Sequence, residues 1–314
     1  MAQRFLVLGD NHGNTESLRR VLDDAAGESF DYAVHVGDLT DAWRWERHSG
    51  DEGGARDRGA EQLREVGPLL AELDDRARHG LVWVYGNQDY FGDLAYDLDV
   101  GTQVPVDGEV TVGGQRFANA PDLVGAEDVL VTHMERWPIV DHFDGLAHFC
   151  GNTHRGRYRG RRLDSAFLHL RDPETGEEDY GGYFFVEVDG DPPFDVELRS
   201  VGSLRRVECE VHRDRGVQFQ PEHRGCMYCE DPRVLYREMA ASAFHGLRTA
   251  RGRDSPAAEE VVEYATTLLA DPPEDFREAF ADYLADPSAD RYAPVAREDG
   301  ELTWSERMLS SRNL

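Results

Sequence analysis

Side chains that can bind metal ions follow five short apolar segments of this chain. Aspartate, asparagine and histidine recur at these positions, and each offers a carboxylate oxygen, an amide oxygen or an imidazole nitrogen. These residues are Asp10 and His12, Asp38 and Asp41, Asn87, His133, and Asn152 and His154. Two transition-metal ions held about 3.5–4 Å apart can clamp a phosphoryl centre and activate water. The pattern therefore predicts a site for one or two transition-metal ions, with Asp38 able to bridge them.

The five apolar segments are typical of β-strands, and helical segments lie between the first three of them. The expected strands cover residues 5–8, 32–36, 81–85, 129–131 and 147–150, and the expected helices cover 15–26 and about 60–78. Strands that alternate with helices at this spacing predict a layered α/β architecture. Ligands of α/β sheets bind at the carboxyl ends of the strands, which is where the polar residues fall. The polar, glycine-rich stretch over 49–59 predicts a loop.

Five motifs along the chain resemble, in order, those of the calcineurin-like metallophosphoesterases. They are Asp10-x-His12, Gly37-Asp38-x-x-Asp41, Gly86-Asn87-Gln88-Asp89, Thr132-His133 and Gly151-Asn152-Thr153-His154. The resemblance covers about residues 1–200. It implies an α/β/β/α sandwich of two mixed sheets flanked by helices, expected over residues 1–204. It also implies hydrolysis of phosphate esters through attack on phosphorus by a metal-bound hydroxide.

The same resemblance implies which residues bind each metal ion. The first ion would be bound by Asp10, His12, Asp38 and His154, and the second by Asp38, Asn87 and His133. The family completes the second set with the first histidine of the last motif, whereas this chain has Asn152 there. Because an asparagine oxygen is a weaker ligand than imidazole, we expect loose occupancy of the second position. Mn²⁺ is the expected ion, with Fe, Zn, Co and Ni as alternatives.

A second departure from the family is Gln88, which stands where the third motif normally has histidine. In the family, that histidine is credited with protonating the leaving group or stabilising the transition state. A glutamine amide can hydrogen-bond phosphate but cannot transfer a proton, and a positioned acid is typically worth about 10²–10⁴-fold in rate. We therefore expect activity on esters with good leaving groups, or an acid from elsewhere. Asp89, His142 and His148 are candidates for that acid, and equally for surface or packing roles.

Five arginines occur within residues 155–162, directly after the expected ligand His154. One interpretation is an anion-binding rim, because the guanidinium group matches phosphate oxygens bidentately. The other is an exposed strand whose arginines pair with surface carboxylates. Since the arginines extend beyond one phosphate, a diester is slightly favoured over a monoester, and a nucleotide is one such substrate. The expected substrate-binding residues are Arg155, Arg157 and Asn11, and the expected catalytic residues are Asp38, Gln88 and Asp89.

Two pairs of residues later in the chain have the spacing of a structural zinc site. Cys209-x-x-His212 and Cys226-x-x-Cys229 would supply three thiolates and one imidazole, and His223 is an alternative fourth ligand. A thioredoxin-type redox pair is a competing interpretation, although no βαβ pattern flanks it. Four unrelated residues with reduced thiols are another. Residues 205–314 are expected to form a separate module, with this Cys/His stretch followed by helices from about residues 233, 255 and 271.

The charge of the chain excludes some partners and says less about others. Of its 314 residues, 62 are acidic and 34 are basic, and every basic residue is arginine. The net charge of −28 argues against general binding to nucleic acid or to an anionic membrane. Acidic excess without lysine favours a salt-adapted, halophile-type surface over an acidic functional surface. No apolar run approaches the ~20 residues that span a bilayer, and no secretory segment is visible, so the expected location is cytoplasmic.

The leading hypothesis is a metal-dependent phosphoesterase that acts on a phosphate-ester substrate. Gln88 and Asn152 motivate a rival, in which a catalytically weak family member works as a binding or scaffolding protein. The C-terminal module would then supply the surface for a protein partner. A third hypothesis is a nuclease component, whose C-terminal module holds nucleic acid. Metal content separates the first two hypotheses, because two tightly bound catalytic ions argue against the scaffold.

Overall fold

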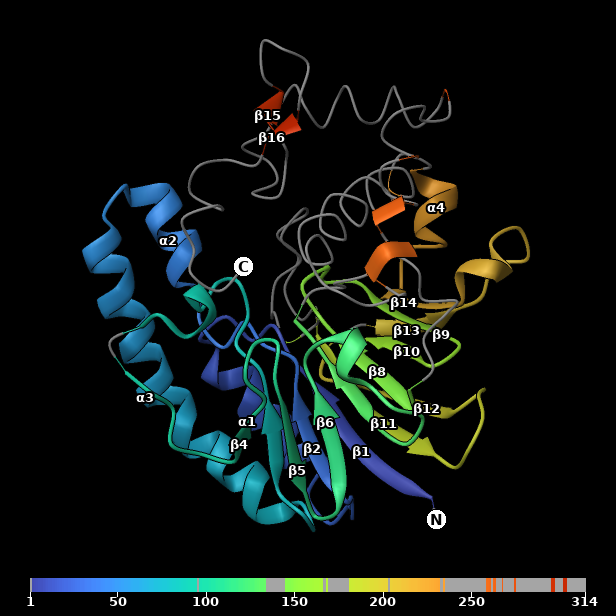
Figure 1. Ribbon diagram of the computed structural model, residues 1–314, viewed down its shortest axis with the longest axis horizontal. Coiled ribbons are helices and arrows are strands. Elements are labelled where there is room, and N and C mark those ends of the chain that lie inside the picture. The colour runs from blue at the N-terminus through green and yellow to red at the C-terminus, as the bar shows by residue number, and fades with distance from the viewer. Residues whose placement is uncertain are drawn as a thin grey trace. The chain divides into compact units, whose positions relative to one another are not determined.

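The computed structural model of the protein describes residues 2–94, 96–133, 145–165, 168, 181–202 and 204–231. Beyond residue 231 it describes positions 234, 258–260, 262–263, 267, 274, 295–296 and 302–303. Most of the helices expected after residues 233, 255 and 271 therefore lie outside the described residues, and so does His142. The described part consists mainly of two large mixed sheets flanked by helices (Figure 1). The expected fold class is confirmed.

The first sheet has six strands in the order β12-β11-β1-β2-β3-β4. Its parallel strands are β1 (Gln3–Leu8), β2 (Tyr32–His35), β3 (Leu81–Trp83) and β4 (Thr102–Gln103). Two antiparallel neighbours extend it, β11 (Gly182–Val188) and β12 (Asp195–Ser200). Because β1, β2 and β3 are parallel, the loops that follow their carboxyl ends emerge at the same edge of the sheet.

The second sheet has eight strands in the order β13-β14-β9-β10-β8-β7-β6-β5. Their bounds are β5 (Glu109–Val112), β6 (Gln115–Ala118), β7 (Val129–Val131), β8 (Ala147–Cys150), β9 (Gly156–Arg159), β10 (Arg162–Asp164), β13 (Leu204–Val207) and β14 (Val217–Pro221). Strands β6, β7, β8 and β10 run parallel, so the loops after β7 and β8 also share one edge. A separate two-stranded sheet pairs β15 (Val295–Ala296) with β16 (Leu302–Thr303).

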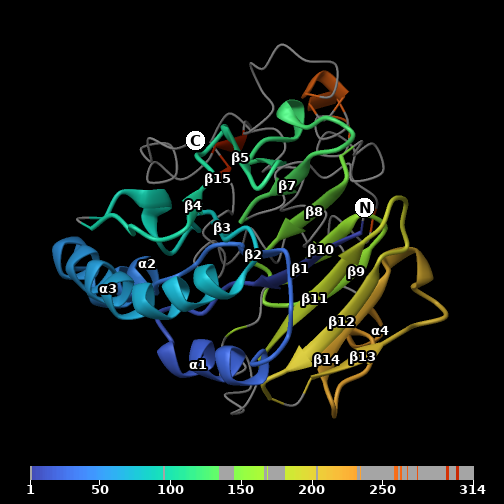
Figure 2. The same ribbon diagram turned by 90° about the horizontal axis from the view of Figure 1, so that it is seen from below.

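Apolar residues pack on both faces of the first sheet. Phe5 and Val7 enter the layer between the two sheets, where Phe149 of β8 also packs. Leu6 and Leu8 enter a second layer, beneath α1 and α3, which lie along the other face of the sheet (Figure 2). Successive residues of β1 thus face opposite layers, as the two-residue period of a strand requires. Up to residue 231, the described helices are α1 (Thr15–Asp24), α2 (Ala42–Ser49), α3 (Glu52–Arg76) and α4 (Met227–Glu230), with single turns η1 (Tyr90–Gly92), η2 (Pro121–Leu123) and η4 (Arg213–Arg215).

The loop expected over 49–59 is wrong, because most of that stretch is the first part of α3. The side chain of Asp51 accepts a hydrogen bond from Gly54 N at 3.0 Å and so caps the helix. Gly59 has a packing role within it. A Cβ atom on Gly59 would lie 2.8 Å from the Cβ of Ala42, so glycine allows α2 to approach α3 closely. The glycine content predicted a loop here, whereas the stretch forms a helix in which Gly59 lies against α2.

Strand β13, which begins at Leu204, and strand β14 lie where the C-terminal module was expected to begin, at residue 205. They form a hairpin, and β14 pairs with β9 through Gln218 opposite Arg157. The hairpin thereby completes the second sheet, and the larger of two compact units in the chain continues to Cys226. Within the described part of the chain, no helix has the length and apolar character that crossing a bilayer needs.

Replacing Gly59 with alanine tests the contact between α2 and α3. Helix propensity alone favours Gly59→Ala by about 1 kcal/mol. We expect the opposite sign, a loss of roughly 1–3 kcal/mol, because the added Cβ overlaps Ala42. The measurement is the free energy of unfolding in urea. Gly53→Ala in the same helix is the matched control, since its nearest atom lies 3.6 Å away and no loss is expected. Equal stabilisation by both substitutions would contradict the close helix contact.

Candidate metal centre

The predicted ligands lie on loops at the carboxyl ends of strands from both sheets. Backbone hydrogen bonds hold these loops in pairs. Asp10 N donates to Gly37 O at 2.9 Å, and His12 N donates to Asp38 O at 2.9 Å, which joins the loops after β1 and β2. Gly151 N donates to His133 O at 2.8 Å, which joins the loops after β7 and β8. The site is therefore built from two fastened pairs of loops, one from each sheet.

The backbone at these loops adopts an uncommon conformation. Five of the seven described non-glycine residues with positive φ belong to the predicted ligand set: Asp10 (53°), His12 (48°), Asp38 (54°), Asn152 (75°) and His154 (54°). This left-handed region costs of order 1–3 kcal/mol for a residue with a side chain, although Asp, Asn and His tolerate it best. Such strain persists only where surrounding contacts hold it, and it concentrates at functional sites. The clustering independently marks these loops as a site.

Four of the predicted ligands converge. The ligand atoms of Asp10, His12, Asp38 and His154 all lie within 4.8 Å of one another. The Nε2 atoms of His12 and His154 are 2.8 Å apart, and His154 Nε2 is 3.1 Å from Asp10 Oδ1. Asp10 and Asp38 are 0% and 1% exposed, respectively. Two carboxylates and two imidazoles thus meet at a site where three residues are buried and His154 is partly exposed.

The chemistry of this donor set fits a bound cation. His12 Nδ1 lies 3.3 Å from the carbonyl oxygen of Thr40, which can only accept, so Nδ1 carries the proton. In the neutral ring, the lone pair on Nε2 is then directed into the cluster. Asp10 Oδ1 is buried and makes no hydrogen bond with any described residue. A divalent ion would satisfy both atoms, so these residues fit the metal implied by the motifs.

His133 and Asp38 meet beside this cluster. His133 Nδ1 donates to the carbonyl of Val36 at 2.8 Å, and His133 Nε2 lies 3.3 Å from Asp38 Oδ1. Burial alone lowers the pKa of His133, but attraction to the Asp38 carboxylate outweighs it and raises the pKa to about 9. Asp38 Oδ2 lies 3.9 Å from His12 Nε2. Asp38 therefore presents one oxygen to each histidine, an arrangement suited to bridging two ions.

The asparagines expected beside His133 also come together. The side-chain amide of Asn87 donates a hydrogen bond to the side-chain oxygen of Asn152. The backbone N of Asn152 donates to Asp10 Oδ2 at 3.2 Å, so Asn152 links the second sheet to the first. These neutral amides offer weaker ligands than the imidazole and carboxylate groups of the first cluster.

Asp89, one of the expected catalytic residues, is held by hydrogen bonds from two neighbouring loops. Its fully buried carboxylate accepts hydrogen bonds from Leu39 N, Thr40 N, Thr40 Oγ1 and Gly86 N, at 2.8–3.1 Å. Burial and the nearby Asp38 charge raise the pKa of Asp89 to about 7, while these hydrogen bonds favour the ionised form. The carboxylate ties the loop after β2 to the loop after β3.

Gln88 also makes contacts that its motif did not reveal. Its Oε1 accepts a hydrogen bond from Arg44 N at 2.8 Å, in the first turn of α2, and its own N donates to Asp38 Oδ1 at 2.7 Å. The N-cap residue of α2 is Asp41, whose side chain makes no capping hydrogen bond and binds Arg58 instead, at 2.7 and 3.0 Å. Gln88 thus supplies the capping acceptor for α2.

Asn11 is buried, although it was expected to bind substrate. Its amide donates to Leu39 O at 3.2 Å, and its Oδ1 accepts from His35 Nε2 at 2.9 Å. Gly37 N donates to His35 Nδ1 at 3.2 Å, which completes the hydrogen bonding of a neutral imidazole. Burial, followed by the charge of His133, lowers the pKa of His35 to about 3.

The arginines of residues 155–162 differ in their surroundings. Arg161 pairs with Asp191, and Arg162 Nε contacts Cys150 Sγ at 3.3 Å, so these two serve the fold. Arg157 lies on β9 opposite Asp164 of β10, and it is half-buried, as is Arg155. Arg155 is the arginine nearest to His154 in the chain.

Two further residues complete the comparison with the sequence. His148 is buried against Thr132 Oγ1 at 3.0 Å, and burial, followed by the Arg162 charge, lowers its pKa well below the usual value. Asp164, which the motifs did not indicate, accepts a hydrogen bond from Thr153 Oγ1 at 2.7 Å and steadies the turn before His154. The four predicted zinc ligands also converge: Cys209, His212, Cys226 and Cys229.

A family model described as calcineurin-like phosphoesterase matches residues 3–172. This span exceeds half of the chain, and the protein belongs to the calcineurin-like phosphoesterase family. Membership supports metal-dependent phosphoesterase activity at the level of the family, with phosphate esters as the class of substrate. Among curated proteins, no sequence matches this chain.

Several solved structures are similar to the chain. A predicted phosphoesterase from Streptococcus pneumoniae is 18% identical, with 64% of this chain and 91% of that chain covered and a TM-score of 0.36. The phosphoesterase Yfce from E. coli is 16% identical, with 63% and 100% covered and a TM-score of 0.28. A metallophosphoesterase from Sphaerobacter thermophilus is 12% identical, with 83% and 98% covered and a TM-score of 0.32.

Replacing Asp89 with asparagine tests its role in joining the loops. Each carboxylate oxygen accepts two hydrogen bonds. The amide NH₂ of Asp89→Asn would oppose Leu39 N and Gly86 N in one orientation and Thr40 N in the other, where the Thr40 hydroxyl can turn and accept. We expect a loss of about 1–3 kcal/mol in the free energy of unfolding. Urea unfolding checks this, with Asp57→Asn on the exposed side of α3 as the control. Unchanged stability together with lost activity would instead favour Asp89 as the catalytic acid.

Proposed function

We propose that this protein hydrolyses phosphate esters at the centre formed by Asp10, His12, Asp38 and His154. The convergence of two carboxylates and two imidazoles on one buried point carries the proposal. Bound divalent ions supply Lewis acidity for the phosphoryl group and an acidified water for the displacement. Family membership supports this class of reaction. A nuclease component remains a narrower version of the same proposal.

The chain's own residues bind and orient the reactants. Asp38 directs one oxygen toward His12 and the other toward His133, so it would contribute a ligand to each ion. The carbonyls of Thr40 and Val36 keep His12 and His133 in the tautomer that ligates through Nε2. Arg155 and Arg157 would bind the phosphate oxygens, because guanidinium groups match them bidentately.

The donor atoms guide the proposed choice of metal. Oxygen and imidazole ligands suit Mn²⁺, which we propose as the working ion, with Fe, Zn, Co or Ni as alternatives. Asn87 and Asn152 offer neutral amide oxygens at the second position, so that position would bind its ion more weakly than the first. Phosphodiesters, including nucleotides, are the proposed substrates, because Arg155, just before β9, and Arg157, within it, offer two guanidinium groups rather than one.

Two proposals concern the surroundings of the protein. None of its four cysteines forms a disulfide, which supports the cytoplasmic location expected from the sequence. The net charge of −28, with arginine as the only basic residue, supports a surface adapted to high salt.

A scaffolding protein of the same fold is the second candidate function. Gln88 favours it, because a side chain whose oxygen caps α2 and which carries no acidic proton cannot replace the family's histidine. This candidate requires weak or absent metal binding at Asp38 and its neighbours, with a protein partner bound through the C-terminal module.

Manganese binding distinguishes the two candidates. Binding to the folded protein alone raises its stability by about 2.7 kcal/mol at a free ion concentration of 100 Kd. We expect Mn²⁺ to raise the thermal midpoint of the wild-type protein and to leave Asp38→Asn nearly unchanged. Asparagine tolerates the positive φ of Asp38, so this variant is expected to fold. Asp57→Asn is the control and should respond like the wild type.

Hydrolysis is measured on the same proteins with bis(p-nitrophenyl) phosphate and p-nitrophenyl phosphate. We expect Mn²⁺-dependent release of p-nitrophenol, faster from the diester, and its loss in Asp38→Asn. No hydrolysis of either ester would sink the enzyme hypothesis, as would full activity in Asp38→Asn.

Because position 88 is glutamine rather than histidine, we also predict how the rate depends on the leaving group. Because Gln88 cannot protonate the departing oxygen, the rate should fall steeply from p-nitrophenyl to phenyl esters. A positioned acid is worth about 10²–10⁴-fold, and the fall should approach that size. The measurement is kcat/KM for a series of aryl esters that differ in leaving-group pKa. A flat dependence would show that another residue donates the proton.

A further inference from the structure

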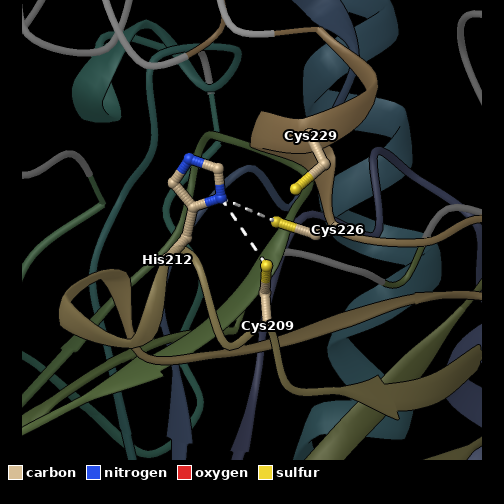
Figure 3. A group of neighbouring side chains, drawn as sticks. All are labelled: Cys209, His212, Cys226 and Cys229. Carbon is tan, nitrogen blue, oxygen red and sulfur yellow. Dashed lines mark hydrogen bonds between the residues drawn. The ribbon is translucent and has the colours of Figure 1, made fainter.

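A second group of metal-ligand side chains lies around the β13–β14 hairpin, outside the predicted phosphoesterase site. Cys209 and His212 lie in the loop that joins β13 to β14. Cys226 precedes α4, and Cys229 lies within that helix. The side chains of all four point toward one another (Figure 3). Residues that precede β14 in the chain and residues that follow it therefore meet at one point.

The distances within this group match tetrahedral coordination of zinc. All four ligand atoms lie within 4.8 Å of one another. His212 Nδ1 is 3.6 Å from Cys209 Sγ and also 3.6 Å from Cys226 Sγ. Zinc bonds of about 2.3 Å to sulfur and about 2.0–2.1 Å to nitrogen place tetrahedral S and N atoms about 3.6 Å apart. One imidazole N–H can donate well to only one sulfur, whereas one cation explains both equal distances.

A buried amide supports the sulfur of Cys226. Gln218 Nε2 donates to Cys226 Sγ at 3.2 Å, and Gln218 is fully buried. A donor held in this way stabilises a thiolate, which is the form that binds a metal, and such outer contacts orient metal ligands. None of the cysteines forms a disulfide. A redox pair would involve two thiols only, and it would not explain why a third thiol and His212 converge on the same point.

We propose that Cys209, His212, Cys226 and Cys229 bind one structural Zn²⁺ ion. Three thiolates and one imidazole complete a tetrahedral shell with no open position, which is the mark of a structural site. The ion would join the loop between β13 and β14 to the segment that follows β14. It would thereby stabilise β14, which pairs with β9, the strand of Arg157. His223, two positions past β14 in an exposed turn, is left outside this ligand set.

Elemental analysis of the purified full-length protein tests the site. We expect one zinc per chain in the wild type and in Asp38→Asn, which separates this site from the proposed catalytic ions. Cys226→Ser should lose the zinc, whereas His223→Ala should retain it. Absence of zinc from Asp38→Asn, iron in its place, or zinc retained by Cys226→Ser would each overturn the proposal.

Thiol labelling tests the site without any substitution that could prevent folding. Cys229 is exposed, so without a metal it should react readily with iodoacetamide, whereas buried Cys150 should not. We expect Cys229 of the native protein to be protected, and to become reactive when a strong chelator removes the zinc. Rapid labelling of Cys229 in zinc-containing protein would rule it out as a ligand.

The contact from Gln218 has its own matched pair of variants. Loss of such an outer contact typically weakens metal affinity by about 10–100-fold. We expect this for Gln218→Leu, measured by competition with a chromogenic zinc chelator. Gln220→Leu is the control, because Gln220 is equally a buried glutamine of β14 and has no contact with the sulfur of Cys226 among the described interactions. Equal affinities in the two variants would remove Gln218 from the site.

Discussion

Two carboxylates, Asp10 and Asp38, are buried where loops of the two sheets meet, and the site depends on how their charge is compensated. Burying an unpaired carboxylate costs several kcal/mol, so such groups require either a partner of opposite charge or a full set of hydrogen bonds. The surrounding imidazoles turn their Nδ1 protons outward, to the carbonyls of Thr40 and Val36, and direct Nε2 inward. Inward lone pairs beside carboxylates repel unless a cation or a proton lies between them. The metal centre is therefore also an electrostatic junction between the sheets.

A third buried carboxylate, Asp89, shows how differently the same residue type can be used a few positions away. Its charge is balanced by four hydrogen bonds from the loops that it joins, which leaves no acceptor position for an ion. Asp10 Oδ1, by contrast, has no hydrogen bond among the described residues. Hydrogen-bond satisfaction, rather than burial or residue type, thus distinguishes the supporting carboxylate of Asp89 from the carboxylate of Asp10. The supporting one keeps the strained backbone of its neighbour Asp38 in place.

Residue order and spacing predicted the strands and a metal site at their carboxyl ends, because parallel strands bring those ends to one edge. The resemblance to the family predicted which four residues form the first cluster. The side-chain partners of Gln88 and Asn11 were beyond such reasoning. Gln88 meets the N-terminus of α2, and Asn11 meets His35, through contacts that exist only after the loops pack. The same limit explains the glycine-rich stretch 49–59. Composition weighs each glycine alone, whereas Gly59 is favoured by the surface of a neighbouring helix.

The two clusters differ in donor chemistry, and this difference can sort metal ions between them. One cluster offers oxygen and imidazole, the other three sulfurs and one imidazole. Thiolates favour zinc strongly over manganese, while carboxylates discriminate little, so zinc would fill the sulfur site first. A net charge of −28 concentrates all cations at the surface alike and cannot supply that selectivity. Selection must therefore come from the donor atoms themselves, which would allow a structural ion and a catalytic ion to coexist in one acidic chain.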